Sequence, residues 1–360
     1  MMAKWTMRIL GSANPGRSGS GLRARVFLLL IALSLAAAPY LGSRAEVITF
    51  FRIGTGSTAG TYFPIGGIIA GGISKPPGSR ECDAGGSCGV PGLIGVVQST
   101  EGSVANVIAI GNGTLESGFS QADISYWAYR GERNFRETGP ITNLRTIANL
   151  FPESMHLVVR KDAGIESVKD LKGKRVSLDR EGSGTRVDAL LVLKSYGVKL
   201  KDIQAFALSS GTAADRLRAG ELDAFFMIAG TPANAIATLA DDGLIDLVPL
   251  KGKPADTLRE TYPFFSKTRI PSGTYLNLAE TETLSVGAQW LVSADVPDDV
   301  VYQITRALWH PSTRLLLDNG HPKGKSINVF TALDGLVVPL HHGARRYYSE
   351  AGIPFPAGTN

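Results

Sequence analysis

The chain has 360 residues, of which 44% are hydrophobic and 19% charged, a composition typical of a globular protein with a substantial buried core. The formal net charge is +5, but residues 1–45 carry six cations and no acidic residue, so the rest of the chain has a net charge of −1. The six cations are Lys4, Arg8, Arg17, Arg23, Arg25 and Arg44. Because the remainder is close to neutral, we expect no nucleic-acid partner.

The N-terminal segment has the order of regions of a secretory signal peptide. A basic stretch precedes the apolar run Val26–Ala38, and Ser43 and Ala45 are the small residues expected at the −3 and −1 positions of a cleavage site. We therefore predict a signal peptide over residues 1–45, cleavage after Ala45 and export to the periplasm. The apolar run is shorter than the ~20 residues that span a bilayer. An uncleaved membrane anchor is the alternative.

The mature chain begins with alternating strands and helices. The run Ile48–Ile53 predicts a strand, and the loop Gly54–Pro64, GTGSTAGTYFP, follows it where a helix should begin. The patterns then predict, in chain order, a helix over Ile65–Ile73, a strand over Leu93–Gln98, a helix over Ser103–Ile110, a strand over Ser117–Gln121 and a strand over Met155–Val159 that crosses between two lobes.

The stretch Ser74–Gly92 interrupts this alternation and contains the two cysteines of the chain, Cys82 and Cys88. We interpret it as an insertion. In an oxidising compartment, a cysteine pair at this spacing in a glycine-rich loop favours a disulfide. Zinc would need two further ligands, and no histidine is close in the sequence. We therefore predict a Cys82–Cys88 disulfide and no metal site.

From Asp170 the pattern starts again, with a second Gly/Ser-rich loop, DREGSGTR, over Asp179–Arg186. The predicted strands are Val176–Leu178, Asp202–Leu208 and Ala224–Ile228, and the predicted helices are Val187–Tyr196 and Ala213–Arg218. Such alternation of strands and helices predicts an α/β fold, in which a mostly parallel sheet is flanked by helices on both faces.

The two halves of the sequence resemble each other. Gly113–Phe119 matches Gly220–Phe225, and the halves come into register when the cysteine insertion is removed. We therefore expect two similar lobes, each with a Gly/Ser/Thr loop at the carboxyl end of its first strand, where open α/β sheets bind ligands. Helix N-termini favour anions there. Since neither loop contains lysine, backbone amides and hydroxyls would be the donors, which suits a carboxylate at least as well as a phosphate.

The apparent enzyme motifs lack the context that their chemistry needs. Gly54–Ala59 fits the dinucleotide fingerprint but is not followed by the acidic residue expected about 20 positions later. Gly85–Gly89 fits the nucleophile-elbow pattern but lies between the cysteines rather than between a strand and a helix. The five histidines lack the HExxH spacing of zinc proteases. We therefore predict that the chain is not an enzyme and has no cofactor.

Taken together, several motifs resemble those of the TAXI-type solute-binding proteins, the extracytoplasmic receptors of a subgroup of TRAP transporters. The resemblance covers nearly all of Ile53–Gly352. The motifs are IGTGSTAGTYFP, STEGSVANV with GFSQAD, LVVRKDAGIESVKDLKGKRVSL, GSGTR, LRAGELDAFFMIAGTP, IPSGTY, SADVPDDVVYQITRAL and ALDGLVVPLHHGARRYY.

The resemblance implies a two-lobed periplasmic-binding-protein fold of type II, whose lobes close on a small organic acid. We expect lobe 1 over residues 46–156 with the insertion at 74–92, lobe 2 over 157–274, and a return to lobe 1 over 275–360. The family is associated with glutamate-like ligands and other carboxylates. Such a receptor would deliver its ligand to a sodium-driven TRAP permease, and we expect a monomer.

The resemblance also implies ligand contacts in both lobes. They are Ser57, Thr58, Gly60, Thr61, Tyr62, Gln121 and Asp123 in lobe 1, Ser183, Gly184, Thr185, Arg186, Ala229, Gly230 and Pro232 in lobe 2, and Tyr275 near the return to lobe 1. Each has a purely structural alternative. The glycines can serve turn geometry alone, and Asp123 can cap a helix. Tyr62 and Tyr275 can be core residues, and Arg186 can be a solvated helix residue.

Three functions follow from these observations. The first is a transport receptor for a small carboxylate that serves a TRAP permease. The second is a receptor that feeds an ATP-driven importer or a sensor kinase. The third is an NAD-dependent oxidoreductase. Gene neighbourhood separates the first two, since a TRAP receptor should be encoded beside a large multi-span permease, and nicotinamide binding would reveal the third.

Overall fold

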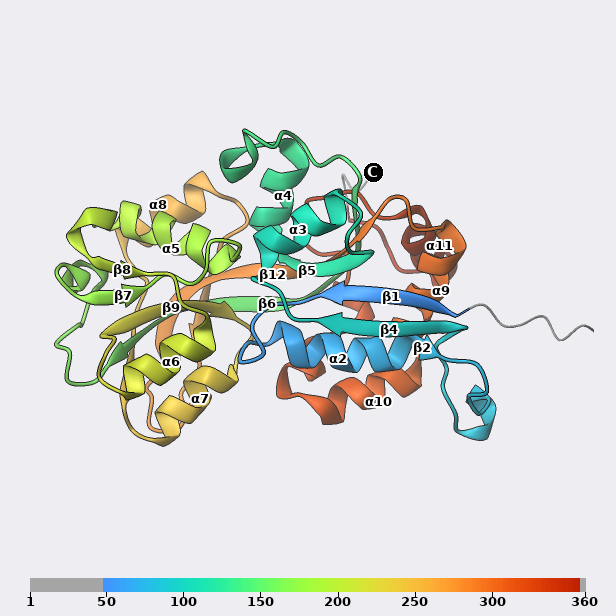
Figure 1. Cartoon of the computed structure of the whole chain (residues 1–360), viewed down its shortest axis with the longest axis horizontal. Helices are drawn as coiled ribbons and strands as arrows, with labels where there is room; N and C mark the ends of the chain where they lie inside the picture. Colours follow the sequence, from blue (N-terminus) through green and yellow to red (C-terminus); the bar gives the residue numbers. More distant parts are fainter. Residues whose placement is uncertain (1–47, 357–360) are drawn as a thin grey trace, which may run out of the picture. The chain divides into compact units, whose positions relative to one another are not determined.

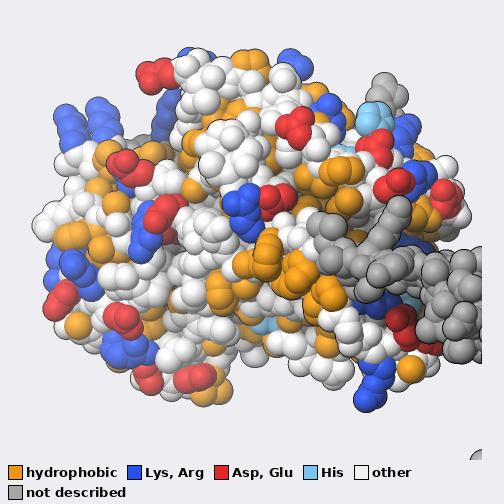
Figure 2. All heavy atoms as spheres, turned by 45° about the vertical axis from the view of Figure 1, so that its right-hand side comes forward, with side chains coloured by type: hydrophobic (Ala, Val, Ile, Leu, Met, Phe, Trp, Pro, Cys, Tyr) orange, Lys and Arg blue, Asp and Glu red, His pale blue; other side chains and the backbone are white. Residues whose placement is uncertain are grey.

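The computed structural model describes residues 48–356 (Figure 1). The signal peptide predicted over residues 1–45 lies outside the described residues and stays a prediction. No helix within residues 48–356 is long and apolar enough to cross a membrane. On the face that Figure 2 presents, basic and acidic side chains are interspersed, so this face has no large region of a single charge.

A ten-stranded sheet forms the centre of the described structure, in the order β4-β1-β5-β12-β6-β9-β7-β8, with β10 paired to β6 and β11 to β12. Its strands are β1 (Thr49–Gly54), β4 (Leu93–Gln98), β5 (Ser117–Gln121), β6 (Leu144–Arg160), β7 (Arg175–Ser177), β8 (Gln204–Phe206), β9 (Ala224–Ala229), β10 (Ile245–Val248), β11 (Ser266–Ile270) and β12 (Thr281–Ser293). The strands predicted from apolar runs are therefore present. Most are shifted by only a few residues at their ends, but the strand predicted over Met155–Val159 is the last part of the much longer β6.

The sheet contains two parallel groups of strands. In the first, β1 pairs in parallel with β4 and β5; in the second, β7 pairs in parallel with β8 and β9. We call these groups, with their helices, the β1 half and the β7 half. The long strands β6 and β12 pair antiparallel to each other and join the halves, since β12 also pairs with β5 and β6 also pairs with β9. The predicted α/β class with parallel strands is confirmed, and the exact lobe boundaries stay a prediction.

Helices cover both faces of each half (Figure 1). On the β1 half, α2 and α10 lie on one face and α3 and α4 on the other; on the β7 half, α6 and α7 lie opposite α5 and α8. The α-helices are α2 (Tyr62–Ile73), α3 (Ser103–Gly111), α4 (Ala122–Arg130), α5 (Gly184–Ser195), α6 (Ser210–Arg218), α7 (Asn234–Asp241), α8 (Lys253–Thr261), α9 (Asp298–Leu308), α10 (Pro311–Gly320) and α11 (His342–Glu350). Short 3-10 helices are η1 (Cys82–Ala84), η2 (Arg133–Phe135), η3 (Val168–Leu171), η4 (Leu200–Asp202), η5 (Pro322–Ser326) and η6 (Val329–Thr331).

Three helices, α2, α5 and α6, begin earlier than the sequence pattern indicates, and the early starts of α2 and α5 shorten the two glycine-rich loops. Helix α2 begins at Tyr62, and its Pro64 is tolerated because a first-turn residue has no intrahelical acceptor for its N–H. Helix α5 begins at Gly184, where the Ser183 side chain caps the helix by accepting from the Thr185 N–H at 3.1 Å. The last residues of both predicted loops are therefore the first turns of helices.

The cysteine insertion forms a small substructure beside the main sheet. Its two-residue strands β2 (Ser74–Lys75) and β3 (Val90–Pro91) pair in parallel. The predicted disulfide between Cys82 and Cys88 is present. His310, which is distant in the sequence, lies with its Nε2 atom 3.9 Å from Cys82 Sγ. Because the two cysteine sulfur atoms are bonded to each other, they are not available as thiolate ligands for a metal ion.

Two glycines give opposite predictions for the packing of α2 on the sheet. A Cβ on Gly95 of β4 would lie 2.8 Å from the carbonyl oxygen of Ala70 in α2, whereas a Cβ on the exposed Gly67 would meet nothing within 4 Å. We expect Gly95→Ala to lower the free energy of unfolding by about 1–3 kcal/mol, because the helix backbone must move. Gly67→Ala should raise it by up to about 1 kcal/mol, because alanine favours a helix interior. Urea unfolding of both variants tests this packing, and shifts of the same sign would contradict it.

Candidate functional site

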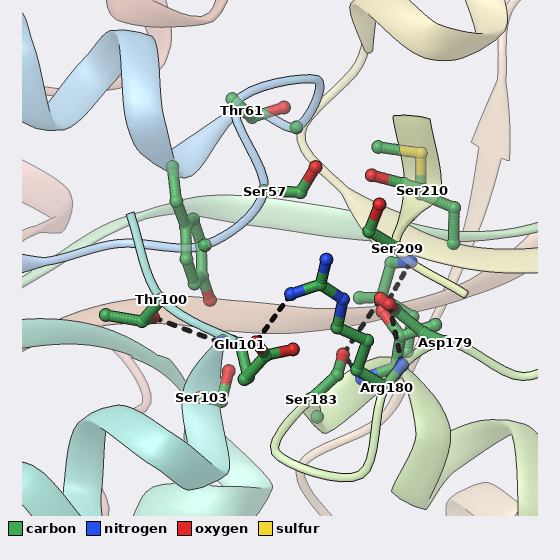
Figure 3. A pocket seen from close by; sticks show the side chains of 18 of the residues that line it. Ser57, Thr61, Thr100, Glu101, Ser103, Asp179, Arg180, Ser183, Ser209 and Ser210 are labelled. Atoms are coloured by element: carbon green, nitrogen blue, oxygen red, sulfur yellow. Dashed lines mark hydrogen bonds and ion pairs between the residues drawn. The ribbon is translucent and has the colours of Figure 1, made fainter. Parts of the chain in front are cut away.

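A cavity of about 190 Å³ lies between the β1 half and the β7 half (Figure 3). Most of its lining comes from residues that follow the carboxyl ends of strands in both halves. They are Gly56, Ser57, Thr58, Gly60, Thr61 and Tyr62 after β1, Ser99–Ser103 after β4, Asp179, Arg180, Ser183, Gly184 and Thr185 after β7, and Ser209 and Ser210 after β8. This is where open α/β sheets bind their ligands. The position of the cavity therefore makes it the candidate site.

Four helices begin at this cavity. Tyr62 is the first residue of α2, Ser103 of α3, Gly184 of α5 and Ser210 of α6, and each of these residues lines the cavity. The first turn of a helix has N–H groups without intrahelical acceptors and carries the positive end of the helix dipole. Their convergence gives the cavity donors for an anionic group without the use of a lysine side chain.

Hydrogen bonds between the two halves surround the cavity. The Thr61 hydroxyl donates to the Gly230 carbonyl oxygen at 2.8 Å. On another side, the Ala105 N–H donates to the carbonyl oxygen of Gly182 at 3.0 Å. Because each bond joins residues from different halves, the structure represents an arrangement in which the halves are in contact around the cavity.

An ion pair crosses the cavity from one half to the other. Arg180, which follows β7, donates from its Nη1 atom to Oε1 of Glu101 at 2.5 Å, and Glu101 precedes α3 (Figure 3). Both side chains are nearly half exposed. Ion pairs with such exposure contribute about 0–1 kcal/mol, because water screens them. The pair can therefore open without a large loss of stability.

Glu153 of β6 adds a buried carboxyl group to the cavity wall. It accepts a hydrogen bond at 2.6 Å from the Tyr62 hydroxyl. Burial raises the pKa of Glu153 to about 8, although this hydrogen bond and the nearby Lys323 ammonium oppose the rise. Burial also disfavours the charged form of Lys323 and therefore lowers the pKa of its ammonium group. Glu153 is therefore mostly protonated at neutral pH until a cation approaches it.

Asp179 is the third acidic residue of the lining. It follows β7 with a φ of 71° and accepts hydrogen bonds from the Arg180 N–H at 2.8 Å and the Ser183 hydroxyl at 3.0 Å. Burial raises the pKa of Asp179 to about 6, and these hydrogen bonds limit the rise. The cavity thus combines helix N-termini with three carboxyl groups, and Arg180 is the one cation among its lining residues.

The structure places nine of the predicted ligand-binding residues on the cavity. They are Ser57, Thr58, Gly60, Thr61, Tyr62, Gln121, Ser183, Gly184 and Thr185. Some of these residues also have structural roles, such as the Thr185 hydroxyl, which accepts from the Ile228 N–H at 3.1 Å. The two loops that the sequence analysis singled out therefore meet at one cavity.

Six predicted residues do not line the cavity, namely Asp123, Arg186, Ala229, Gly230, Pro232 and Tyr275. Arg186 lies within the first turn of α5, and its guanidinium is 3.9 Å from the Glu181 carboxylate. Tyr275 is a core residue, since its hydroxyl accepts from the Ala233 N–H and lies 3.0 Å from Nε2 of His156. The structural alternative describes the observed position of Tyr275, a core residue, whereas the Arg186 side chain lies on a helix but is mostly buried rather than solvated.

The other four lie beside or beneath the cavity wall. The Gly230 carbonyl oxygen accepts the hydrogen bond from the Thr61 hydroxyl. Ala229 is buried in the core, and the peptide bond between Thr231 and Pro232 is cis. Asp123 is fully buried in the first turn of α4, and its side chain does not cap that helix. The sequence places these residues at strand ends, but only the fold decides which side chains reach the cavity.

Several lining residues were not predicted. Ser99–Ser103 follow β4, and Ser209 and Ser210 follow β8, so the rule that ligands bind beyond the carboxyl ends of strands would have found them. Asp179 and Arg180 lie within a predicted loop, from which the resemblance implies only Ser183–Arg186 as contacts. Glu153 lies within the long strand β6, and no local motif indicates that it faces a cavity.

A comparison with known families identifies the broader group. The chain belongs to the NMT1-like family, whose sequence profile matches residues 53–352. The predicted membership of the TAXI type is narrower than this finding and stays a prediction.

Solved structures that the chain matches over most of its length include binding proteins from several bacteria. SsuA from Xanthomonas axonopodis pv. citri, described as an alkanesulfonate-binding protein bound to MOPS, has 17% identity and a TM-score of 0.46, with 85% of each chain covered. SsuA from Escherichia coli, a periplasmic aliphatic sulphonate binding protein, has 15% identity and a TM-score of 0.41, covering 85% of this chain and 94% of its own. PhnD1 from Prochlorococcus marinus, in complex with methylphosphonate, has 13% identity and a TM-score of 0.49, covering 85% of this chain and 99% of its own.

The raised pKa of Glu153 predicts how stability changes with pH. A carboxyl group whose pKa is higher in the folded state retains its proton while the unfolded chain loses it, so this group lowers stability as pH rises from about 4.5 to about 8. Glu153→Gln cannot ionise. We expect the difference in unfolding free energy between variant and parent to shift in favour of the variant by more than about 1 kcal/mol between pH 5 and pH 8.5.

Urea unfolding at the two pH values measures this difference. Glu181→Gln, a change at an exposed carboxylate in the same cavity loop, is the control and should show little dependence on pH. A constant difference for Glu153→Gln at both pH values would contradict the buried, protonated state of Glu153.

Proposed function

We propose that the chain is an extracytoplasmic solute-binding receptor, rather than an enzyme, that captures a small organic carboxylate and delivers it to a TRAP-type secondary transporter. The observation that carries the proposal is the convergence of four helix N-termini from two halves of the sheet on one cavity. A ligand held there contacts both halves at once, so binding favours their closed arrangement.

The size of the cavity supports a small ligand. Pockets for drug-sized molecules usually have volumes of about 300–1,000 Å³. This cavity, at about 190 Å³, is smaller and lined mainly by hydroxyl groups, glycines and carboxyl groups. A metabolite with few non-hydrogen atoms and several polar groups fits it better than an extended or apolar molecule.

The charges of the lining support a ligand with both an anionic and a cationic group, such as a glutamate-like amino acid. The helix N-termini suit a carboxylate, whereas the Glu101 and Asp179 carboxylates would repel a ligand that carries only negative charge. An ammonium group near Glu153 would favour its ionised form and form a charged hydrogen bond. A dianionic phosphate finds no lysine in the lining, and the guanidinium of Arg180 is already paired with Glu101.

A thermal-shift screen of the purified protein tests the proposed ligand class. The panel contains amino acids, dicarboxylates, alkanesulfonates and alkylphosphonates. We expect an amino acid or another carboxylate to raise the melting temperature in a concentration-dependent manner, because a ligand that binds only the folded state stabilises it. A response to sulfonates or phosphonates alone would overturn the carboxylate assignment while leaving a solute receptor.

Two arginines give a matched test of the site. Arg180 lines the cavity, whereas Arg186, six residues further along the chain, does not. We expect Arg180→Gln to weaken binding of the ligand from the screen by up to about tenfold, because Glu101 loses its charged partner and its carboxylate then repels the ligand carboxylate. Arg186→Gln should leave affinity within about twofold of the parent. Isothermal titration calorimetry measures both, and a larger effect at Arg186 would argue against this cavity.

The membrane partner is tested separately. A TRAP receptor should restore uptake only together with its multi-span permease, whereas a receptor for an ATP-driven importer should require an ATPase. Uptake assays in cells that express the receptor with the permease encoded beside it distinguish these two cases.

A further inference from the structure

Two buried aspartates from opposite halves meet beneath the floor of the cavity. Asp123 lies in the first turn of α4 in the β1 half, and Asp188 lies in α5 in the β7 half. Both side chains are fully buried. Within residues 48–356, neither carboxyl oxygen of Asp123 makes a hydrogen bond of good geometry, and Oδ1 of Asp188 also lacks one. Burial raises the pKa of the Asp123 carboxyl group, and this effect outweighs that of the N–H groups of Asp123 and Ile124, which lower it. The two carboxyl groups are within reach of each other, but as carboxylates neither can donate.

Gln121 connects this pair to the cavity. Its side chain lines the cavity, and its Nε2 atom donates to Oδ2 of Asp188 at 2.6 Å, across the boundary between the halves. Gln121 also lies two residues before Asp123 in the chain. The β1 half therefore presents an amide donor and a carboxyl group to the same aspartate of the β7 half.

A buried pair of carboxylates is strongly destabilising unless it binds a cation or a proton. One proton converts the pair into a donor and an acceptor, and the resulting hydrogen bond between an acid and a carboxylate is short and strong. When the halves separate, water can hydrate each aspartate, and both ionise at neutral pH. The need for the proton thus arises only when the halves meet.

We propose that Asp123 and Asp188 form a proton-binding site between the halves, and that closure of the halves takes up one proton. The proposal rests on the proposed function in one respect, namely that the halves open and close. The closed state then binds a proton in addition to the solute. Acidic conditions then favour closure, and alkaline conditions favour opening.

The charged groups around Asp123 and Asp188 favour a bound proton over an ion pair with a basic side chain. Burial and the neighbouring carboxyl group raise the pKa of Asp188 well above its usual range, and burial raises the pKa of Asp123 to about 6. Glu153 of β6 faces the pair as a third acid, with Tyr62 of α2 donating to it. The Lys323 ammonium of η5 lowers the pKa of Glu153 and so opposes the effect of burial there.

The proposal is tested without any ligand by small-angle X-ray scattering of the full mature protein between pH 5 and pH 9. We expect the radius of gyration of the parent to increase as pH rises, because the ionised pair disfavours contact between the halves. Asp188→Asn imitates the protonated pair, since its amide can donate to Asp123 and accept from Gln121. This variant should keep the smaller radius over the whole range.

Two further variants make the outcome specific. Asp123→Asn supplies the amide donor from the other half and should behave as Asp188→Asn does, which covers the case in which one of them fails to fold. Asp215→Asn, at an exposed aspartate of α6, controls for net charge and should follow the parent. Circular dichroism confirms that each variant is folded.

A radius that does not change with pH in the parent would overturn the proposal. It would also be overturned if the aspartate variants changed with pH as the parent does, since Glu153 or Asp179 would then be the titrating group. Replacement of sodium by choline in the buffer distinguishes binding of a proton from binding of sodium. A radius of gyration that depends on sodium rather than on pH would show that the two aspartates bind sodium, which would overturn the proposal. None of these outcomes depends on the identity of the transported solute.

Proton uptake on binding is the second readout, with L-glutamate as the probe. Calorimetry in buffers of different ionisation enthalpy should show that the parent takes up more protons on binding than Asp188→Asn does, by up to one per ligand, because any proton that Glu153 releases is lost by both proteins. Absence of L-glutamate binding would count against the proposed ligand, whereas equal proton exchange in the parent and in Asp188→Asn would count against the carboxyl pair.

Discussion

The antiparallel pairing of β6 with β12 is the constraint on which the site depends. These two long strands hold the β1 half and the β7 half in one sheet, so that the carboxyl ends of both parallel groups face the same cavity. Every helix that begins there does so because a parallel strand ends beside it. Glu153 lies on β6 itself, which places a carboxyl group at the centre of the site rather than on a loop.

The site combines donors that are fixed with acids whose charge depends on what is bound. Backbone N–H groups at the starts of α3 and α5 keep their direction and charge at any pH. Glu153 and Asp179 have raised pKa values, so their charge responds to a nearby cation. Such a site can favour a carboxylate at one end and an ammonium group at the other without a buried ion pair of its own. The same low-polarity surroundings that raise these pKa values act on the carboxyl pair of Asp123 and Asp188.

Much of the fold and part of the site could be predicted from the sequence, because strand, loop and helix patterns are local. The loops at Gly54–Pro64 and Asp179–Arg186 were found from glycines and hydroxyl residues alone. Arg186 does not line the cavity, because it lies in the first turn of α5, whereas Arg180 lies in the loop before that helix and lines the cavity. The contact between Asp123 and Asp188 could not be predicted, since the residues belong to different halves and no local pattern links them.

The central claim is that one small carboxylate is held by the helix N-termini of both halves. A crystal structure of the protein with the carboxylate selected by the thermal-shift screen tests this claim most directly. The account predicts that the ligand carboxylate accepts hydrogen bonds from backbone N–H groups in the first turns of α3 and α5, with any ammonium group directed to Glu153 or Asp179. A ligand bound to one half only, or outside the cavity, would contradict it.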